Sequence, residues 1–288
     1  MKTAILPPAL RAALVLSALA AGPPGPSPAA AAEEALDLCA YKPAFMEEFD
    51  SLSVAPRVLN AARWISHTPW NGDFGDARFV DDALAGPFSI KDGILHITAR
   101  RDEAGKWRSG LLAASDGTGA GFGLRYGYFE ARMRLPPGPG TWPAFWLGTR
   151  RPNTDKTPSI EIDVIEYYGH SDAAYSAALH VWYKGEDKNR TTNTVQKIPV
   201  PAGSLLDDFH TYGVRVTPEA ITYYLDRKPV WRRPTPPELD KPLFPLVNLA
   251  LGSGFPIERT PNPSVLLVDY VHVYAPDPEG RGGRCPAR

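Results

Sequence analysis

The chain has 288 residues, a formal net charge of −1 and no stretch that gathers its 31 Lys and Arg residues. Nucleic acids and anionic membranes require concentrated basic residues, so we expect neither as a partner. The chain is long enough to bury a sizeable hydrophobic core, and its partner is expected to be uncharged or weakly charged.

The first 32 residues have the pattern of a secretory signal peptide followed by a Pro/Ala-rich spacer. Lys2 precedes an apolar run from Ala9 to Ala21, and a Gly, Pro, Ser and Ala stretch continues to Ala32. The run is too short for a transmembrane helix, which needs roughly 20 apolar residues. We therefore expect a secreted or periplasmic protein with a single domain over residues 33–288.

The two cysteines, Cys39 and Cys285, stand near the two ends of this domain. An exported protein meets an oxidising compartment, so we expect a disulfide bond between them. Two free thiols are the alternative. Neither cysteine has a neighbour pattern typical of catalysis or zinc binding.

Apolar residues recur at every second position, which predicts β-strands with one buried face. Residues 88–90 and 94–99 predict a hairpin, because Gly93 can adopt positive φ in the turn between them. A strand with alternating faces follows at Tyr126–Leu135. The later predicted strands are Trp142–Leu147, Ile160–Tyr167, Tyr175–Tyr183, Thr211–Val216, Ile221–Leu225, Leu246–Leu251 and Leu266–Tyr274.

Many short strands without alternating helices predict an all-β sandwich or barrel rather than a parallel α/β sheet. A jelly roll of two antiparallel sheets fits best. The Pro-rich stretches at 135–140 and 233–242 are expected to be loops, and no break in composition marks a second domain.

Three carboxylates, Glu161, Asp163 and Glu166, stand within six residues of one predicted strand. On a regular strand Glu161 and Asp163 share a face, whereas Glu166 has the opposite parity. A β-bulge at Val164 or Ile165 would return Glu166 to the face of the other two acids. A solvated face of an edge strand is the alternative interpretation.

The spacing of the two glutamates is that of a retaining glycosidase. Four strand rises span about 13 Å, and two inward-leaning Glu side chains leave roughly 5–6 Å between carboxyls. Retention needs about 5–5.5 Å and inversion about 6.5–9.5 Å. One carboxylate would attack the anomeric carbon and the other would act as general acid/base. Asp163 between them would help keep the acid protonated through like-charge repulsion.

The segment from Glu161 to Glu166 resembles the E-x-D-x-x-E active-site signature of glycoside hydrolase family 16. Further segments resemble the laminarinase and lichenase branch of that family, in the family's order: Tyr126–Arg132, Gly140–Trp146, Phe209–Gly213 and Val268–Tyr274. The resemblance implies a concanavalin-like jelly roll of two curved sheets, with a sugar-binding cleft on the concave face and no required cofactor. It implies Glu161 as nucleophile, Asp163 as its helper and Glu166 as acid/base.

The resemblance also implies which side chains hold the sugar. Trp142 and Trp146 share a strand face and are expected to line the cleft, where indole rings stack on pyranose units; paired core tryptophans are the alternative. His180 and Trp182 share parity on the following strand, and His180 is expected to contact sugar or Glu166.

Tyr168 and the loop from Trp70 to Phe74 are further expected sugar contacts. Family members often hold a structural calcium ion away from the cleft, and the corresponding residues here are Glu48 and Asp269. A surface aspartate without a metal is the alternative, because such sites leave a weak trace in sequence.

The resemblance predicts an endo-β-glycosidase that acts as a monomer on a polysaccharide, either β-1,3 or mixed β-1,3/1,4 glucan or a related bacterial exopolysaccharide. The segment His67–Asp76 is similar to relatives that depolymerise polymers such as succinoglycan. A non-catalytic β-glucan-binding, lectin-like module and a transglycosylase with the same acids are the competing hypotheses.

Overall fold

The computed structural model describes residues 36–70, 72–82 and 86–279. The predicted signal peptide and Cys285 lie outside the described residues, so the leader, the domain boundary at residue 33 and the disulfide bond of Cys39 stay predictions. No helix within the described ranges is long and apolar enough to cross a membrane.

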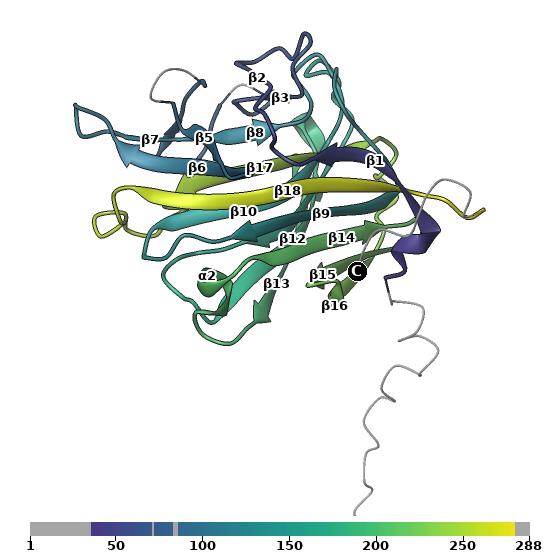
Figure 1. The fold of residues 1–288 in the computed structure, drawn as a ribbon. Coiled ribbons are helices and arrows are strands. Elements are labelled where there is room, and N and C mark those ends of the chain that lie inside the picture. Colours follow the sequence, from purple (N-terminus) through teal and green to yellow (C-terminus); the bar gives the residue numbers. More distant parts are fainter. Residues whose placement is uncertain (1–35, 71, 83–85, 280–288) are drawn as a thin grey trace, which may run out of the picture. The chain divides into compact units, whose positions relative to one another are not determined.

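Strands dominate the described part of the chain (Figure 1). Its elements are η1 (Leu38–Ala40), β1 (Tyr41–Glu47), β2 (Val54–Ala55), β3 (Trp64–Ile65), β4 (Arg78–Phe79), β5 (Phe88–Lys91), β6 (Ile94–Arg101), β7 (Trp107–Ser109), β8 (Leu111–Ala113), β9 (Gly127–Arg134), β10 (Thr141–Thr149), β11 (Ser159–Glu166), β12 (Ala174–Trp182), η2 (Gly185–Arg190), β13 (Thr192–Pro199), α2 (Ser204–Asp207), β14 (His210–Val216), β15 (Ala220–Leu225), β16 (Lys228–Pro234), β17 (Leu243–Leu251) and β18 (Ser264–Pro276).

These strands form two sheets, which confirms the all-β sandwich. The ten-stranded sheet has the order β16-β15-β14-β9-β18-β6-β7-β4, with β1 beside β18 and β5 beside β6. The eight-stranded sheet has the order β13-β12-β11-β10-β17-β8-β3-β2. Two short pairs, β2 with β3 and β4 with β7, are parallel. These two pairs, where short segments join a sheet edge, differ from the antiparallel pairing that the sequence predicted.

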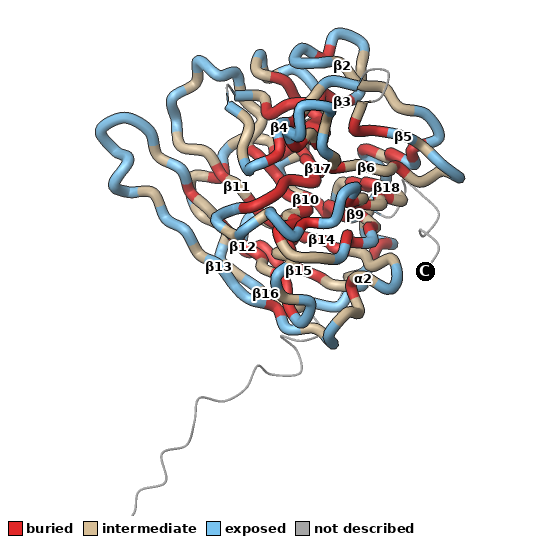
Figure 2. Tube along the Cα trace, turned by 90° about the vertical axis from the view of Figure 1, so that its left-hand side faces the viewer, coloured by how far each residue is buried: buried red, intermediate tan, exposed pale blue. Residues whose placement is uncertain are grey.

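The hydrophobic core lies between the two sheets. Phe129 and Met133 of β9 and Ile162 of β11 are fully buried in one cluster, and Figure 2 shows the buried stretches running through the central strands. Burial of apolar surface contributes roughly 25 cal/mol per Å². Because a slip by one residue would turn acidic side chains into this core, the register of β11 is strongly fixed.

The sequence pattern predicted the β5–β6 turn but not several strands with exposed surfaces. In the β5–β6 hairpin both Asp92 (φ 54°) and Gly93 (φ 74°) are left-handed, as a two-residue hairpin turn requires. The strands β1, β13 and β16 were missed, because much of their surface is exposed and their apolar residues do not alternate. Residues 233–234 belong to β16, so the predicted loop is shorter than expected.

Candidate active site

The predicted β-bulge in β11 is confirmed. Between Asp163 and Glu166, three steps along β11 face two steps along β12, and the pairing with β10 skips Val164. Val164 and Ile165 both pack into the core between the sheets. Glu166 therefore joins Glu161 and Asp163 on the outer face of the eight-stranded sheet, where all three line one pocket.

This pocket brings together most of the residues expected at the site. β10 and β17 supply its floor beside β11, and the segment before β4 supplies one wall. Its lining residues are Trp70, Phe74, Trp142, Ala144, Trp146, Glu161, Asp163, Glu166 and Asn248.

Glu166 is held by two hydrogen-bond donors. Its Oε1 accepts from Trp142 Nε1 and from the Tyr168 hydroxyl, each at 3.0 Å. Burial, helped by the charge of Asp163, raises the pKa of Glu166 to about 7, although both donors lower it. A carboxyl that exchanges its proton near neutral pH is suited to general acid/base chemistry.

Asp163 is paired with His180 of β12. Oδ2 of Asp163 lies 3.0 Å from Nε2 of His180, and Nδ1 of His180 lies 2.8 Å from Oδ1 of Asn193. Burial lowers the pKa of His180, but the Asp163 carboxylate and Asn193 raise it to about 9. His180 therefore contacts Asp163 and Asn193 rather than Glu166, the protein partner that we expected.

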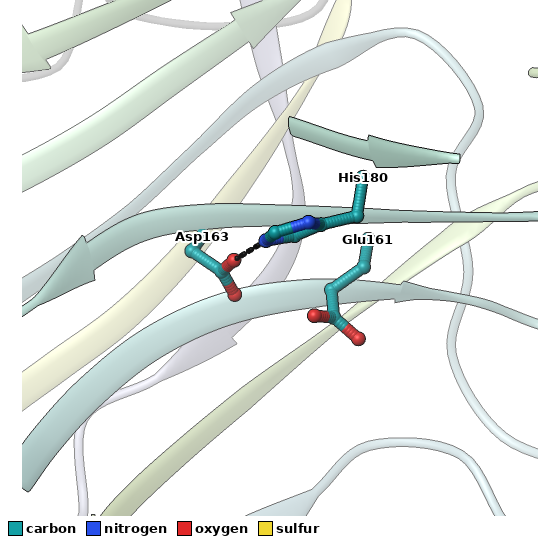
Figure 3. Close-up of side chains that lie close together, drawn as sticks. All are labelled: Glu161, Asp163 and His180. Atoms are coloured by element: carbon teal, nitrogen blue, oxygen red, sulfur yellow. Dashed lines mark ion pairs between the residues drawn. The ribbon is translucent and has the colours of Figure 1, made fainter. Parts of the chain in front are cut away.

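Glu161 lies beside this pair (Figure 3). Burial and the charges of Asp163 and Glu166 raise the pKa of Glu161 to about 8, opposed by the charge of His180 and a hydrogen bond from Trp182. Ligand atoms of Glu161, Asp163 and His180 lie within 4.8 Å of one another, a grouping that could also hold a metal ion. However, Nε2 of His180 already pairs with Asp163.

The tryptophans divide into covered and open rings. Trp146 is only 5% exposed, packs against Trp70 at 5.8 Å between ring centroids, and donates from Nε1 to Asn248. It lines the pocket but fits the core alternative better than a free sugar platform. Trp70 is 38% exposed and Trp182 is 36% exposed, so these two offer the open indole faces.

The loop that carries Trp70 is anchored by an unpredicted contact. Nδ1 of His67 lies 3.0 Å from Asp73, and its Nε2 lies 3.0 Å from Asp81. The loop also delivers Phe74, whose ring lies 5.2 Å from that of Trp142. The sequence predicted this loop but not the contacts of His67, because strand periodicity does not indicate where Asp73 and Asp81 lie.

The residues expected to bind calcium have other partners. Glu48 lies 2.8 Å from Nε2 of His272, and Asp269 forms an ion pair with Arg132. In the described ranges, the side chains grouped as metal ligands are instead those of the acidic pocket. A calcium ion at Glu48 and Asp269 stays a prediction.

Comparisons with known proteins agree with this geometry. A family model described as Glycosyl hydrolases family 16 matches residues 89–253. The chain belongs to glycoside hydrolase family 16. The beta-glucanase of Rhodothermus marinus is 31% identical over 205 residues, covering 64% of this chain and 69% of the relative. The family predicted from the acidic motif is thus confirmed.

Two other family 16 relatives come from Rhizobium meliloti (strain 1021). The endo-1,3-1,4-beta-glycanases ExsH and EglC are 32% and 30% identical, each over 84% of this chain. The chain spans only 53% and 54% of their lengths. The laminarinase catalytic domain of Thermotoga petrophila RKU-1 shares the fold, with a TM-score of 0.63, 22% identity and coverage of 82% of this chain and 98% of that domain.

Proposed function

We propose that this chain is a retaining endo-β-glycosidase that hydrolyses β-1,3 or mixed β-1,3/1,4 glucan by double displacement. The observation that carries the proposal is the bulge in β11, which brings Glu161, Asp163 and Glu166 into one pocket while Trp142 and Tyr168 hold Glu166. Two carboxylates beside open tryptophan rings are what glycosidic bond cleavage requires.

In the first displacement a carboxylate oxygen of Glu161 bonds to the anomeric carbon as the glycosidic C–O bond breaks, and Glu166 gives its proton to the departing oxygen. In the second, Glu166 takes a proton from water, the water oxygen bonds to the anomeric carbon, and the bond to Glu161 breaks. Each residue returns to its starting state.

The proposed steps require a particular distribution of protons between the two glutamates. The pKa values of about 8 for Glu161 and about 7 for Glu166 belong to a coupled pair that shares protons near neutral pH. The reaction needs the proton on Glu166 and the negative charge on Glu161. Positive charge that develops at the anomeric carbon in the transition state stabilises that arrangement.

Asp163 and His180 serve as positioning residues. The charge of His180 lowers the pKa of Glu161, which favours the ionised nucleophile, whereas the charge of Asp163 raises it. Asp163, in turn, raises the pKa of Glu166, which favours the protonated acid.

The activities for which the relatives are named support the substrate class. Two are called endo-1,3-1,4-beta-glycanases and a third a beta-glucanase. A related bacterial exopolysaccharide is the second candidate, favoured by the segment His67–Asp76 that forms the Trp70 loop. Export through the N-terminal leader, action as a monomer and a structural calcium ion at Glu48 and Asp269 belong to the same proposal.

The test is cleavage of a polymer panel by the mature protein and by Glu161→Gln. Laminarin, mixed-linkage glucan, κ-carrageenan, agarose and succinoglycan are incubated with each, and new reducing ends and product sizes are measured. We expect oligosaccharides from a glucan and a loss of several orders of magnitude, roughly 10⁴-fold or more, in the variant. Binding without cleavage by the unmodified protein would instead favour the lectin-like module, and products longer than the substrate would favour transglycosylation.

Azide separates the roles of the two glutamates. In Glu166→Ala, azide should attack the covalent intermediate and give a glycosyl azide of retained configuration. In Glu161→Ala, azide should attack from the face that the nucleophile has vacated and give the inverted azide. The opposite pairing of variant and product would exchange the two assignments.

A further inference from the structure

A second groove opens from Glu161 and contains no part of Glu166. Both open tryptophans, Trp70 and Trp182, line it together with Glu161. Glu161 bonds to the sugar that stays on the enzyme, whereas Glu166 serves the departing sugar. A groove that adjoins only Glu161 is suited to the glycone part of the polymer, and the remaining faces of the two indole rings can stack on sugars.

Two cations, Arg151 and Lys184, also line this groove. Among the described residues Lys184 forms no ion pair within 4.0 Å. Its pKa is lowered by burial and by the nearby charges of Arg151 and Lys156. The Arg151 guanidinium donates to the backbone oxygen of Thr157 and lies 3.9 Å from the nearest Asp155 oxygen. Arg151 and Lys184 thus bring two positive charges to this wall of the groove, with Asp155 as a nearby acid.

The acids near these cations also have other partners. Asp116 lines the groove, but its carboxylate accepts from the backbone N–H groups of Leu59 and Thr118 and from the Thr118 hydroxyl. Asp155 accepts twice from Thr157 and also lies 3.6 Å from Lys241. Glu161 also lines the groove, and the positive charge of His180 acts on its carboxyl.

We propose that Lys184 and Arg151 bind an acidic substituent on the glycone part of the polysaccharide, so that the enzyme prefers an anionic polymer over a neutral one with the same backbone. An ammonium and a guanidinium beside two stacking rings form a site for a sugar that carries a carboxylate or a sulfate ester. The proposal rests on the proposed hydrolase function and names the substrate class of that same cleft.

The test uses one mixed-linkage glucan in two forms, untreated and with part of its primary hydroxyl groups oxidised to carboxylates. For the unmodified protein at about 0.05 M salt, we expect kcat/KM to be roughly three- to tenfold higher on the oxidised polymer, and the preference to shrink at about 0.5 M salt. A sulfated form of the same glucan distinguishes recognition of any negative charge from recognition of a carboxylate.

Lys184→Gln should abolish the preference for the oxidised polymer, while Lys184→Arg should retain it. The control is Lys188→Gln, an exposed cation of the same η2 segment that lies outside the groove lining. Equal preference in Lys184→Gln and the unmodified protein, or no preference in the unmodified protein, would overturn the proposal.

Binding to the Glu161→Gln chain separates this proposal from the hydrolase proposal. Titration calorimetry with oligosaccharides of both forms measures the preference without cleavage. Tighter binding of the acidic form, lost on adding Lys184→Gln, supports the anion site even if no polymer is cut. Equal binding of the two forms rejects the anion site even if the glucan is hydrolysed.

Discussion

The strands β9 and β11 both carry buried acids, but they differ in the charged partners that these acids have. On β9, Glu130 is fully buried, and Arg227 donates to both of its carboxylate oxygens at 3.1 and 2.8 Å. On β11, the three acids of the pocket have a single cationic partner, the imidazole that pairs with Asp163.

This difference distinguishes an acid that stabilises the fold from acids that are suited to proton transfer. A buried carboxylate with a matched cation can remain charged in the fold, whereas crowded acids without enough partners raise one another's pKa and cost stability. In the proposed mechanism protons must move in this pocket near neutral pH, which accounts for this cost in stability. Burial alone therefore does not mark the strand proposed to be catalytic; the supply of charged partners does.

The largest change in stability is expected on β9, where Glu130 is paired with Arg227. Glu130→Gln should lower the free energy of unfolding by about 2–4 kcal/mol, because it leaves the half-buried Arg227 without its charge partner. Urea unfolding measures the loss. The protein that remains folded should keep its kcat/KM, because Glu130 lies outside the acidic pocket.

A double-mutant cycle sharpens this prediction. Glu130→Gln combined with Arg227→Gln should be less destabilised than the sum of the two single variants, because no unpaired charge is left. Strict additivity would show that the ion pair does not stabilise the fold, and the contrast between the two faces would then disappear.

Removing a carboxylate from the acidic pocket should instead increase the stability of the fold. The pKa of Glu161 rises from an ordinary 4.5 to about 8 and that of Glu166 from 4.5 to about 7. Both carboxyls bind protons more tightly in the folded chain, so stability falls as the pH rises from about 4.5 through about 8. Glu161→Gln should therefore stabilise the fold by about 1–3 kcal/mol at pH ~8, and by much less at pH ~4.5.

Thermal unfolding across this pH range checks the sign. Glu166→Gln should behave in the same way with a smaller gain, because its pKa shift is smaller. Glu130→Gln is the matched control and should be destabilised at both ends of the range. A Glu161→Gln chain that is less stable than the unmodified protein at pH ~8 would contradict the view that these acids lack enough cationic partners to stabilise their charge.

The sequence could predict the acidic strand and its bulge because the signals for both are local. Ile162 and Val164 had to face the core, and the wrong parity of Glu166 then demanded a bulge, which the structure contains. Strand periodicity and the acidic motif were both local signals, so no knowledge of distant contacts was needed.

Other features depended on partners that are distant in sequence. Glu130 and Tyr128 alternate with core residues of β9, yet both are fully buried. The cover comes from Arg227 in the turn after β15 and from Tyr274 and Leu38. Trp146 likewise lost its open face to the loop before β4. Periodicity specifies which face a side chain takes but not what packs on that face.

The smallest predicted effect concerns the donor on Glu166. Tyr168→Phe removes a hydrogen bond that lowers the pKa of Glu166. The pKa of the acid should therefore rise, and the alkaline limb of the pH dependence of kcat/KM should move upward by up to about one unit. Weaker positioning of the acid should lower kcat/KM at the optimum by roughly three- to tenfold. Initial rates on the preferred glucan across pH measure both.

Tyr270→Phe on the ten-stranded sheet is the matched control. It removes a 3.3 Å hydrogen bond to Glu130, also from a tyrosine hydroxyl to a buried carboxylate. Since Glu130 remains paired with Arg227, the pH profile of kcat/KM should not move. A shift of similar size in both variants would mean that the Tyr168 effect is transmitted through general loosening of the fold, whereas a shift confined to Tyr168→Phe ties the alkaline limb to the proton on Glu166.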